Sequence, residues 1–226
     1  MRKMNKVLSM LLMIVLVVAL LPIKTEAATM KLNKKKVSLK AGNTCTIKVD
    51  TEEDAKNIIW SSSNKKVVAI KQIGKKAKIF AIKKGTAKIT CTINGVKKTC
   101  KVTVKKNTNF SAKQVQNIME GSLRAKGYIT FVEGAQKDWD EGVYAEGVEK
   151  GWYTYEDIME GAPSFGASNT ILYVNKNNVY GCVKGLVTFY EKYFNDGGNK
   201  KYTKEFYFKY LGKSKKTGAY MYKCYF

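Results

Sequence analysis

The chain has 226 residues, with 41 lysines and arginines against 18 aspartates and glutamates, a formal net charge of +23. It contains no histidine, which excludes serine–histidine and cysteine–histidine nucleophiles and the usual histidine-containing zinc sites. The composition therefore predicts no cofactor and no metal site, and it leaves only carboxylate-based chemistry open to an enzyme.

The N-terminus is typical of a signal peptide. A basic start is followed by an apolar run over residues 7–21 and a short polar stretch that ends at Ala27, with small residues at Thr25 and Ala27. The run is shorter than the roughly 20 residues that a helix needs to cross a bilayer. We therefore expect residues 1–27 to be cleaved rather than kept as a membrane anchor. The mature protein is predicted to be secreted, extracellular, without a transmembrane segment, and non-covalently associated with the cell wall if it is retained there.

The positive charge is concentrated in the first part of the mature chain. Residues 28–106 contain 21 lysines and 4 acids, net +17, whereas residues 107–226 contain 16 basic and 13 acidic residues, net +3. This break predicts two domains with these boundaries. A potential of this sign attracts polyanions and weakens with salt, so an anionic cell-wall polymer is an expected partner, with simple solubility as the alternative. Nucleic acid is not expected, because the lysines form no known reader motif.

Residues 28–106 read as about seven short strands. Apolar residues alternate with polar ones, as at Cys45, Ile47 and Val49, and turn residues separate the runs. The Asn94-Gly95 pair is a typical two-residue hairpin turn. Many short strands over about 80 residues predict an all-β sandwich.

Three runs in this part carry a family resemblance: VSLKAGNTCTIKV, IIWSSSNKKVVAI and KKGTAKITCTINGVKKTCKVTV. They resemble the bacterial Ig-like domain of group 2, BIG2-like, with its glycine before the second strand, its Trp-Ser-Ser-x-Asn corner and its Gly-Thr-Ala opening of the penultimate strand. The resemblance implies an Ig-like sandwich on a bacterial surface protein, adhesins included, often serving as a spacer. It transfers no catalytic residue, and Trp60 is expected in the core.

Five cysteines are candidates for disulfides. Counting through the hairpin places Cys91 opposite Lys98 and Cys100 opposite Ile89, so both thiols face inward, as does Cys45 from the facing sheet. A Cys45–Cys91 bridge, a Cys45–Cys100 bridge and three reduced, buried thiols are all compatible with this pattern. Cys182 and Cys224 are a second candidate pair, and an odd total leaves at least one thiol free in a monomer.

Residues 107–226 are predicted to form a small, aromatic-rich α+β domain of no recognised type. Ser111 and Gln114 form a capping box at the start of a helix that continues to Lys126-Gly127. Residues 133–160 hold nine acids against two lysines, with a short helix expected at 155–160. Residues 171–174 and 178–184 are predicted to form a hairpin, and 185–194 fit helix and strand equally. Two more strands are expected at 203–211 and 219–226, joined by the basic loop 212–218.

All fourteen tyrosines lie in this second domain. On the last two strands Phe206, Phe208 and Tyr210, then Tyr220, Tyr222, Cys224 and Phe226, share one side. The other side holds the predicted ligand-binding residues Tyr207, Lys209, Lys223 and Tyr225, since tyrosine offers flat apolar area with a polar tip. Packing of both sides into a core is the competing interpretation.

The only dense supply of carboxylates is Glu133, Asp138, Asp140, Glu141 and Glu146. The stretch from Asp138 to Glu141 resembles a calcium loop but lacks its glycine and its distal glutamate. We therefore predict a non-enzymatic secreted or cell-surface binding or adhesion protein, in which an Ig-like spacer carries a C-terminal domain that recognises a glycan or protein ligand. A carboxylate-dependent cell-wall or glycan hydrolase and a structural envelope component are the alternatives.

Overall fold

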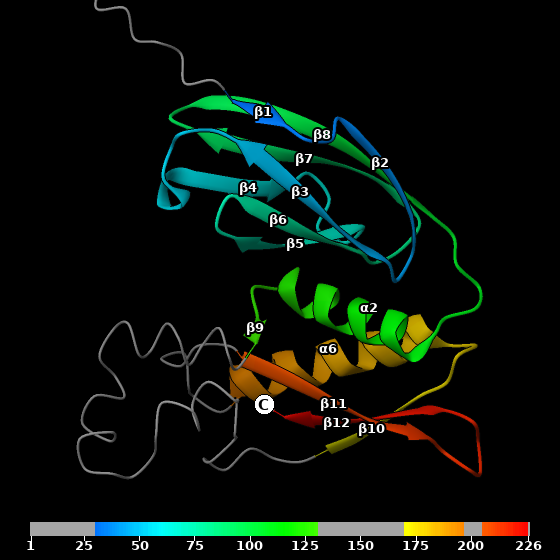
Figure 1. Cartoon of the computed structure of the whole chain (residues 1–226). Helices are drawn as coiled ribbons and strands as arrows, with labels where there is room; N and C mark the ends of the chain where they lie inside the picture. Colours follow the sequence, from blue (N-terminus) through cyan, green and yellow to red (C-terminus); the bar gives the residue numbers. More distant parts are fainter. Residues whose placement is uncertain (1–29, 131–169, 197–204, 226) are drawn as a thin grey trace, which may run out of the picture.

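The computed structural model describes residues 30–130, 170–196 and 205–225, arranged in layers (Figure 1). A β-sandwich forms one end, two helices lie beneath it, and a second sheet covers the far side of the helices. The predicted signal peptide, the acidic stretch 133–160 and the helix expected at 155–160 lie outside the described residues.

The first part of the chain folds into two four-stranded sheets that face each other. Their strand orders are β1-β3-β6-β5 and β2-β8-β7-β4, and every pairing is antiparallel except that of β2 with β8. The strands are β1 Lys31–Leu32, β2 Lys36–Lys40, β3 Thr44–Asp50, β4 Ile58–Ser62, β5 Val68–Ile73, β6 Lys76–Ala81, β7 Gly85–Ile93 and β8 Val96–Lys105, with a short 3-10 helix at Ala55–Asn57. The predicted β-sandwich is confirmed.

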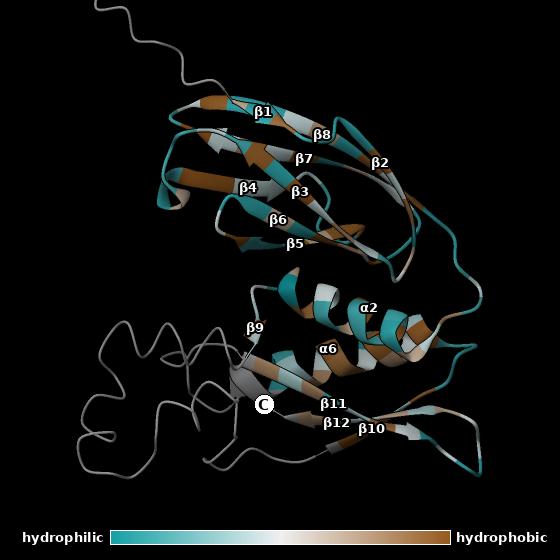
Figure 2. Ribbon diagram, viewed as in Figure 1, coloured by the Kyte–Doolittle hydropathy of each residue, from teal (hydrophilic) through white to brown (hydrophobic). Residues whose placement is uncertain are grey.

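Alternation along the strands builds the sandwich core. Figure 2 shows hydrophobic and hydrophilic residues following one another along the strands, and the inward members, such as Ile47, Ile79 and Ile89, are fully buried. The hairpin turn takes positive φ angles of 48° at Asn94 and 81° at Gly95, which these two residue types accept readily. The predicted register is confirmed, with Cys91 opposite Lys98 and Ile89 opposite Cys100.

Trp60 lies less deep than expected. It pairs with Cys91 across β4 and β7 and packs against the core, but it is only half-buried. Its ring nitrogen is shielded from solvent and has no hydrogen-bond acceptor among the described residues.

The C-terminal region combines two helices with the second sheet. The sheet order is β10-β12-β11-β9, with β9 parallel to β11 and the other pairs antiparallel. The elements are α2 Ala112–Arg124, β9 Ile129–Thr130, β10 Thr170–Val174, α6 Val179–Asp196, β11 Glu205–Lys213 and β12 Tyr220–Tyr225. The predicted capping box is confirmed: Ser111 accepts from the backbone of Gln114, and the Gln114 side chain accepts from the backbone of Ser111.

One predicted element is wrong. Residues 178–184 do not return as a strand beside β10 but begin the 18-residue helix α6, which also decides the ambiguous stretch 185–194. Helical spacing explains this outcome, because Val179, Val183, Leu186 and Tyr190 form one buried stripe. The strands predicted at 203–211 and 219–226 are confirmed as β11 and β12.

Helix α2 joins the sandwich to the C-terminal region. Its Asn117 side chain donates to the carbonyl of Gly42 at 2.8 Å, and the hydroxyl of Tyr180 on α6 donates to the carbonyl of Ile82 at 3.2 Å. Buried residues of the sandwich, the helices and the second sheet form one continuous core. The C-terminal sheet therefore packs on the two helices that contact the sandwich.

Candidate ligand-binding face

The inner face of the C-terminal sheet is core. Phe206, Phe208, Tyr222 and Cys224 are buried beneath the helices. The hydroxyl of Tyr222 donates to the carbonyl of Ala112 at 2.6 Å, which satisfies a polar group that burial would otherwise penalise. Burial raises the pKa of the Tyr222 hydroxyl, so it stays a hydrogen-bond donor. This face is therefore not accessible to a ligand.

The opposite side of the same sheet, called here the outer face, is formed by alternate residues of three strands. Ile171 and Tyr173 on β10 are 48% and 54% exposed, Tyr207 and Lys209 on β11 are exposed, and Lys223 on β12 is half-buried. Tyrosine and isoleucine thus lie on a solvent-facing surface beside two lysines.

The register brings the predicted residues together. Tyr207 lies opposite Tyr225, and Lys209 lies opposite Lys223. Strand β10 adds Ile171 opposite Lys223, so Ile171, Lys223 and Lys209 follow one another across three strands. The pattern predicted from the last two strands alone is thus extended by a third strand.

Ile171 and Tyr173 were not predicted as site residues. Their signal is the alternation Ile171-Leu172-Tyr173-Val174, in which Val174 is buried and Leu172 half-buried while the other two are exposed. Assigning this strand to the same surface requires knowing that β10 pairs with β12, about fifty residues later in the chain.

The strands of the outer face contain more lysine than acid. The sequences of β10 and β12 contain no acid, and that of β11 contains only Glu205 at its start. Lys209 and Lys223 lie directly opposite each other. Two adjacent ammonium groups favour a ligand with anionic or strongly polar oxygen atoms.

The five cysteines are free thiols in this structure, and the Cys45–Cys91, Cys45–Cys100 and Cys182–Cys224 bridges stay predictions. Burial raises the pKa of Cys91 to about 11 and that of Cys224 to about 12. Both thiols are therefore protonated at neutral pH and are poor nucleophiles.

Among residues 30–130, 170–196 and 205–225, no group of three acids or cysteines is placed to hold a metal ion. In the same ranges, no helix is long and apolar enough to cross a membrane. The carboxylates considered for hydrolysis, from Glu133 to Glu146, lie outside the described residues.

No protein-family model and no curated protein matches the chain. Among solved structures, the chain is similar to domains 4 and 5 of the S-layer protein SbsC, with 16% identity, 34% of this chain and 50% of that chain covered, and a TM-score of 0.30. It is also similar to the M1 domain from titin, with 9% identity and a TM-score of 0.27. That match covers 35% of this chain and 95% of the titin domain. A third similar structure is the BIgI domain of beta protein from S. agalactiae bound to CEACAM1, with 14% identity and a TM-score of 0.22. That match covers 35% of this chain and 97% of the BIgI chain. The chain spans half the length of the SbsC fragment.

Proposed function

We propose that this chain is an exported, non-enzymatic binding protein of the cell surface, and that its outer face recognises a cell-wall glycan. The exposed outer face supports the proposal. Ile171 and Tyr173 leave about half of their surface in solvent, although the same sheet buries Phe206 and Tyr222 on its other side. Apolar and aromatic side chains gathered on one solvent-facing surface mark interaction sites in soluble proteins.

The chemistry of the outer face favours an extended polar polymer. The tyrosine rings present flat apolar area to the ring faces of sugars, while Lys209 donates to hydroxyl and carboxylate oxygens. A twisted sheet surface offers contact along its length rather than enclosure, which suits a chain-like ligand more than a small molecule.

The layered fold supports presentation of this face. Helix α2 is fixed to the sandwich through Asn117 and to the sheet through Tyr222, so binding on the outer face does not require the sheet to be ordered first. A pre-organised surface lowers the entropy cost of association.

Co-sedimentation of the mature chain, residues 28–226, with purified Gram-positive cell wall tests the proposal. Tyr173→Ala and Ile171→Ser should each weaken binding about tenfold, the effect of removing an interface anchor. The difference should persist in about 0.5 M salt, where the screening length falls to a few ångströms.

Ile73→Ser is the matched control, because Ile73 is an exposed isoleucine on strand β5 of the sandwich, 49% accessible. It should leave high-salt binding unchanged. If both outer-face variants bind wall as well as the unmodified chain in high salt, the outer face is not the recognition surface, and a structural envelope role becomes the better account.

A further inference from the structure

A second surface, distinct from the outer face, lies on the sandwich. The solvent side of the sheet β2-β8-β7-β4 consists mainly of lysine, serine and threonine, which alternate with buried or half-buried residues along β2, β8 and β7. The edge strand β4 contributes Ser61 and the exposed Ile59. None of the four strand sequences contains an acid. We call this surface the lysine–threonine face.

Three lysines lie in one row across this face. Lys36 on β2 is opposite Lys101 on β8, which is in turn opposite Lys88 on β7. Neighbouring strands are about 4.8 Å apart, so the row places three ammonium side chains over roughly 10 Å. All three are exposed, and none forms an ion pair with a described residue.

Such a row costs stability in the free protein. Like charges directly opposite each other on a sheet destabilise it, and no acid on these strands offsets the repulsion. A bound anion removes that cost, so the row favours a ligand carrying several negative charges.

A row of hydroxyl groups, called here the hydroxyl row, lies beside the lysine row. Ser38, Thr103 and Thr86 are opposite one another on β2, β8 and β7, two residues further along the first two strands. Lys40 and Lys105 then form another cationic pair. Two residues of a strand span about 6.6–6.8 Å, so cationic and hydroxyl groups alternate at this interval.

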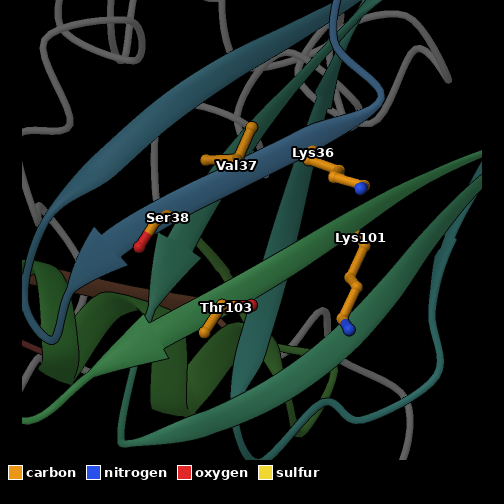
Figure 3. A pocket seen from close by; sticks show the side chains of 5 residues that line it. All are labelled: Lys36, Val37, Ser38, Lys101 and Thr103. Carbon is orange, nitrogen blue, oxygen red and sulfur yellow. The ribbon is translucent and has the colours of Figure 1, made fainter.

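The seam between β2 and β8 is hollowed into a shallow groove. Lys36, Val37, Ser38, Lys101 and Thr103 line it, with a volume of about 460 Å³. Figure 3 shows the two lysine side chains extending from the neighbouring strands, with the hydroxyl groups of Ser38 and Thr103 further along. Ammonium and hydroxyl groups therefore reach the same groove.

We propose that the lysine–threonine face binds a linear polyol phosphate, a polymer in which phosphodiesters alternate with hydroxyl-bearing units. Lysines supply charge-assisted hydrogen bonds to phosphate oxygens, and the serine and threonine hydroxyls both donate to and accept from the polyol. Nucleic acid fits less well, because single strands are gripped by stacking on exposed aromatic side chains and these four strands contribute only Trp60, which packs against the core.

Binding of lipid-free poly(glycerol phosphate) to the mature chain tests this site by titration calorimetry at several salt concentrations. Substituting all three lysines of the row, Lys36→Gln, Lys88→Gln and Lys101→Gln, should weaken binding at least about tenfold, with a clearly smaller salt dependence. The matched control is Lys65→Gln, Lys66→Gln and Lys83→Gln, which makes the same charge change at exposed positions outside these strands and should change affinity less than about twofold.

The hydroxyl row separates polyol phosphate from a generic polyanion. Ser38→Ala with Thr103→Val should weaken poly(glycerol phosphate) binding about threefold to tenfold. Binding of inorganic polyphosphate should weaken less, because its chain has no hydroxyl groups to donate to Ser38 and Thr103. If the triple variant of the lysine row and the triple control variant lose affinity equally, the lysine–threonine face is not the binding site. Equal behaviour of the two polymers in the hydroxyl variant, or tighter binding of single-stranded DNA or anionic vesicles, would overturn the ligand class. None of these results depends on Tyr173, so the proposed function of the outer face is judged separately.

Discussion

Gly121 of helix α2 lies directly against Phe80 of strand β6. A methyl group at Gly121 would come within 2.8 Å of the Phe80 Cβ and 3.1 Å of the Ile82 Cγ1. Only a residue without a side chain lets the helix approach the sandwich this closely, and the packing of the two halves of the chain depends on that approach.

Gly121→Val should therefore destabilise the protein. The added atoms must displace β6 or α2, and overpacking of this kind costs about 1–3 kcal/mol. Gly185→Val in α6 is the control, because nothing lies within 4 Å of a Cβ placed at that position. It should be neutral or slightly stabilising, since valine has the higher helix propensity. Urea unfolding measures both, and equal free energies of unfolding for the two variants would show that the close contact is unimportant.

Asn117 makes a buried polar contact between helix α2 and the sandwich. The residue is buried, and its amide donates to the carbonyl of Gly42. Asn117→Ala removes the donor and leaves that carbonyl without its side-chain partner, which should lower the free energy of unfolding by about 1–3 kcal/mol. Asn57→Ala is the comparison, because the Asn57 amide makes a longer, exposed contact of 3.4 Å with Glu53. A loss at position 117 no greater than at position 57 would argue against a stabilising role.

Local patterns were sufficient to predict the sandwich. The Asn94-Gly95 turn fixes which residues of β7 and β8 lie opposite one another, so the positions of Cys91 and Cys100 followed from counting. The capping box at Ser111 was equally local, because its two partners are three residues apart.

Features that depend on distant pairing were not predictable. The stretch 178–184 is too short to distinguish helical from strand periodicity, and only the longer stripe through Leu186 and Tyr190 identifies α6. The excess of lysine was visible in the sequence, but the row was not, because Lys36 and Lys101 become neighbours only through the parallel pairing of β2 with β8. The outer face likewise lacked Tyr173 until β10 was placed beside β12.

The repulsion within the lysine row makes a separate prediction about stability. Lys101 lies between Lys36 and Lys88, so Lys101→Gln should raise the melting temperature at low ionic strength, by an amount that corresponds to about 0.5 kcal/mol. The gain should shrink as salt screens the charges. Lys66→Gln, at an exposed position outside the strands, should show a smaller gain. Thermal unfolding followed by circular dichroism at about 10 mM and 500 mM salt makes the comparison, and a gain that does not depend on salt would contradict the electrostatic explanation.

The buried thiols predict how stability changes in alkali. Burial raises the pKa of Cys91 from 9.0 to about 11, so between these values the folded protein keeps a proton that the unfolded chain releases. Unfolding then releases protons, and the free energy of unfolding falls as the pH rises above about 9. Below pH 9 the thiol is protonated in both states and contributes no slope.

Cys91→Ala removes this contribution to the pH dependence. The free energy of unfolding of the variant should therefore decline less steeply between pH 8.5 and 10.5 than that of the unmodified chain, as measured by urea unfolding with a reductant present. Identical slopes for Cys91→Ala and the unmodified chain would mean that the Cys91 thiol ionises alike in the folded and unfolded states.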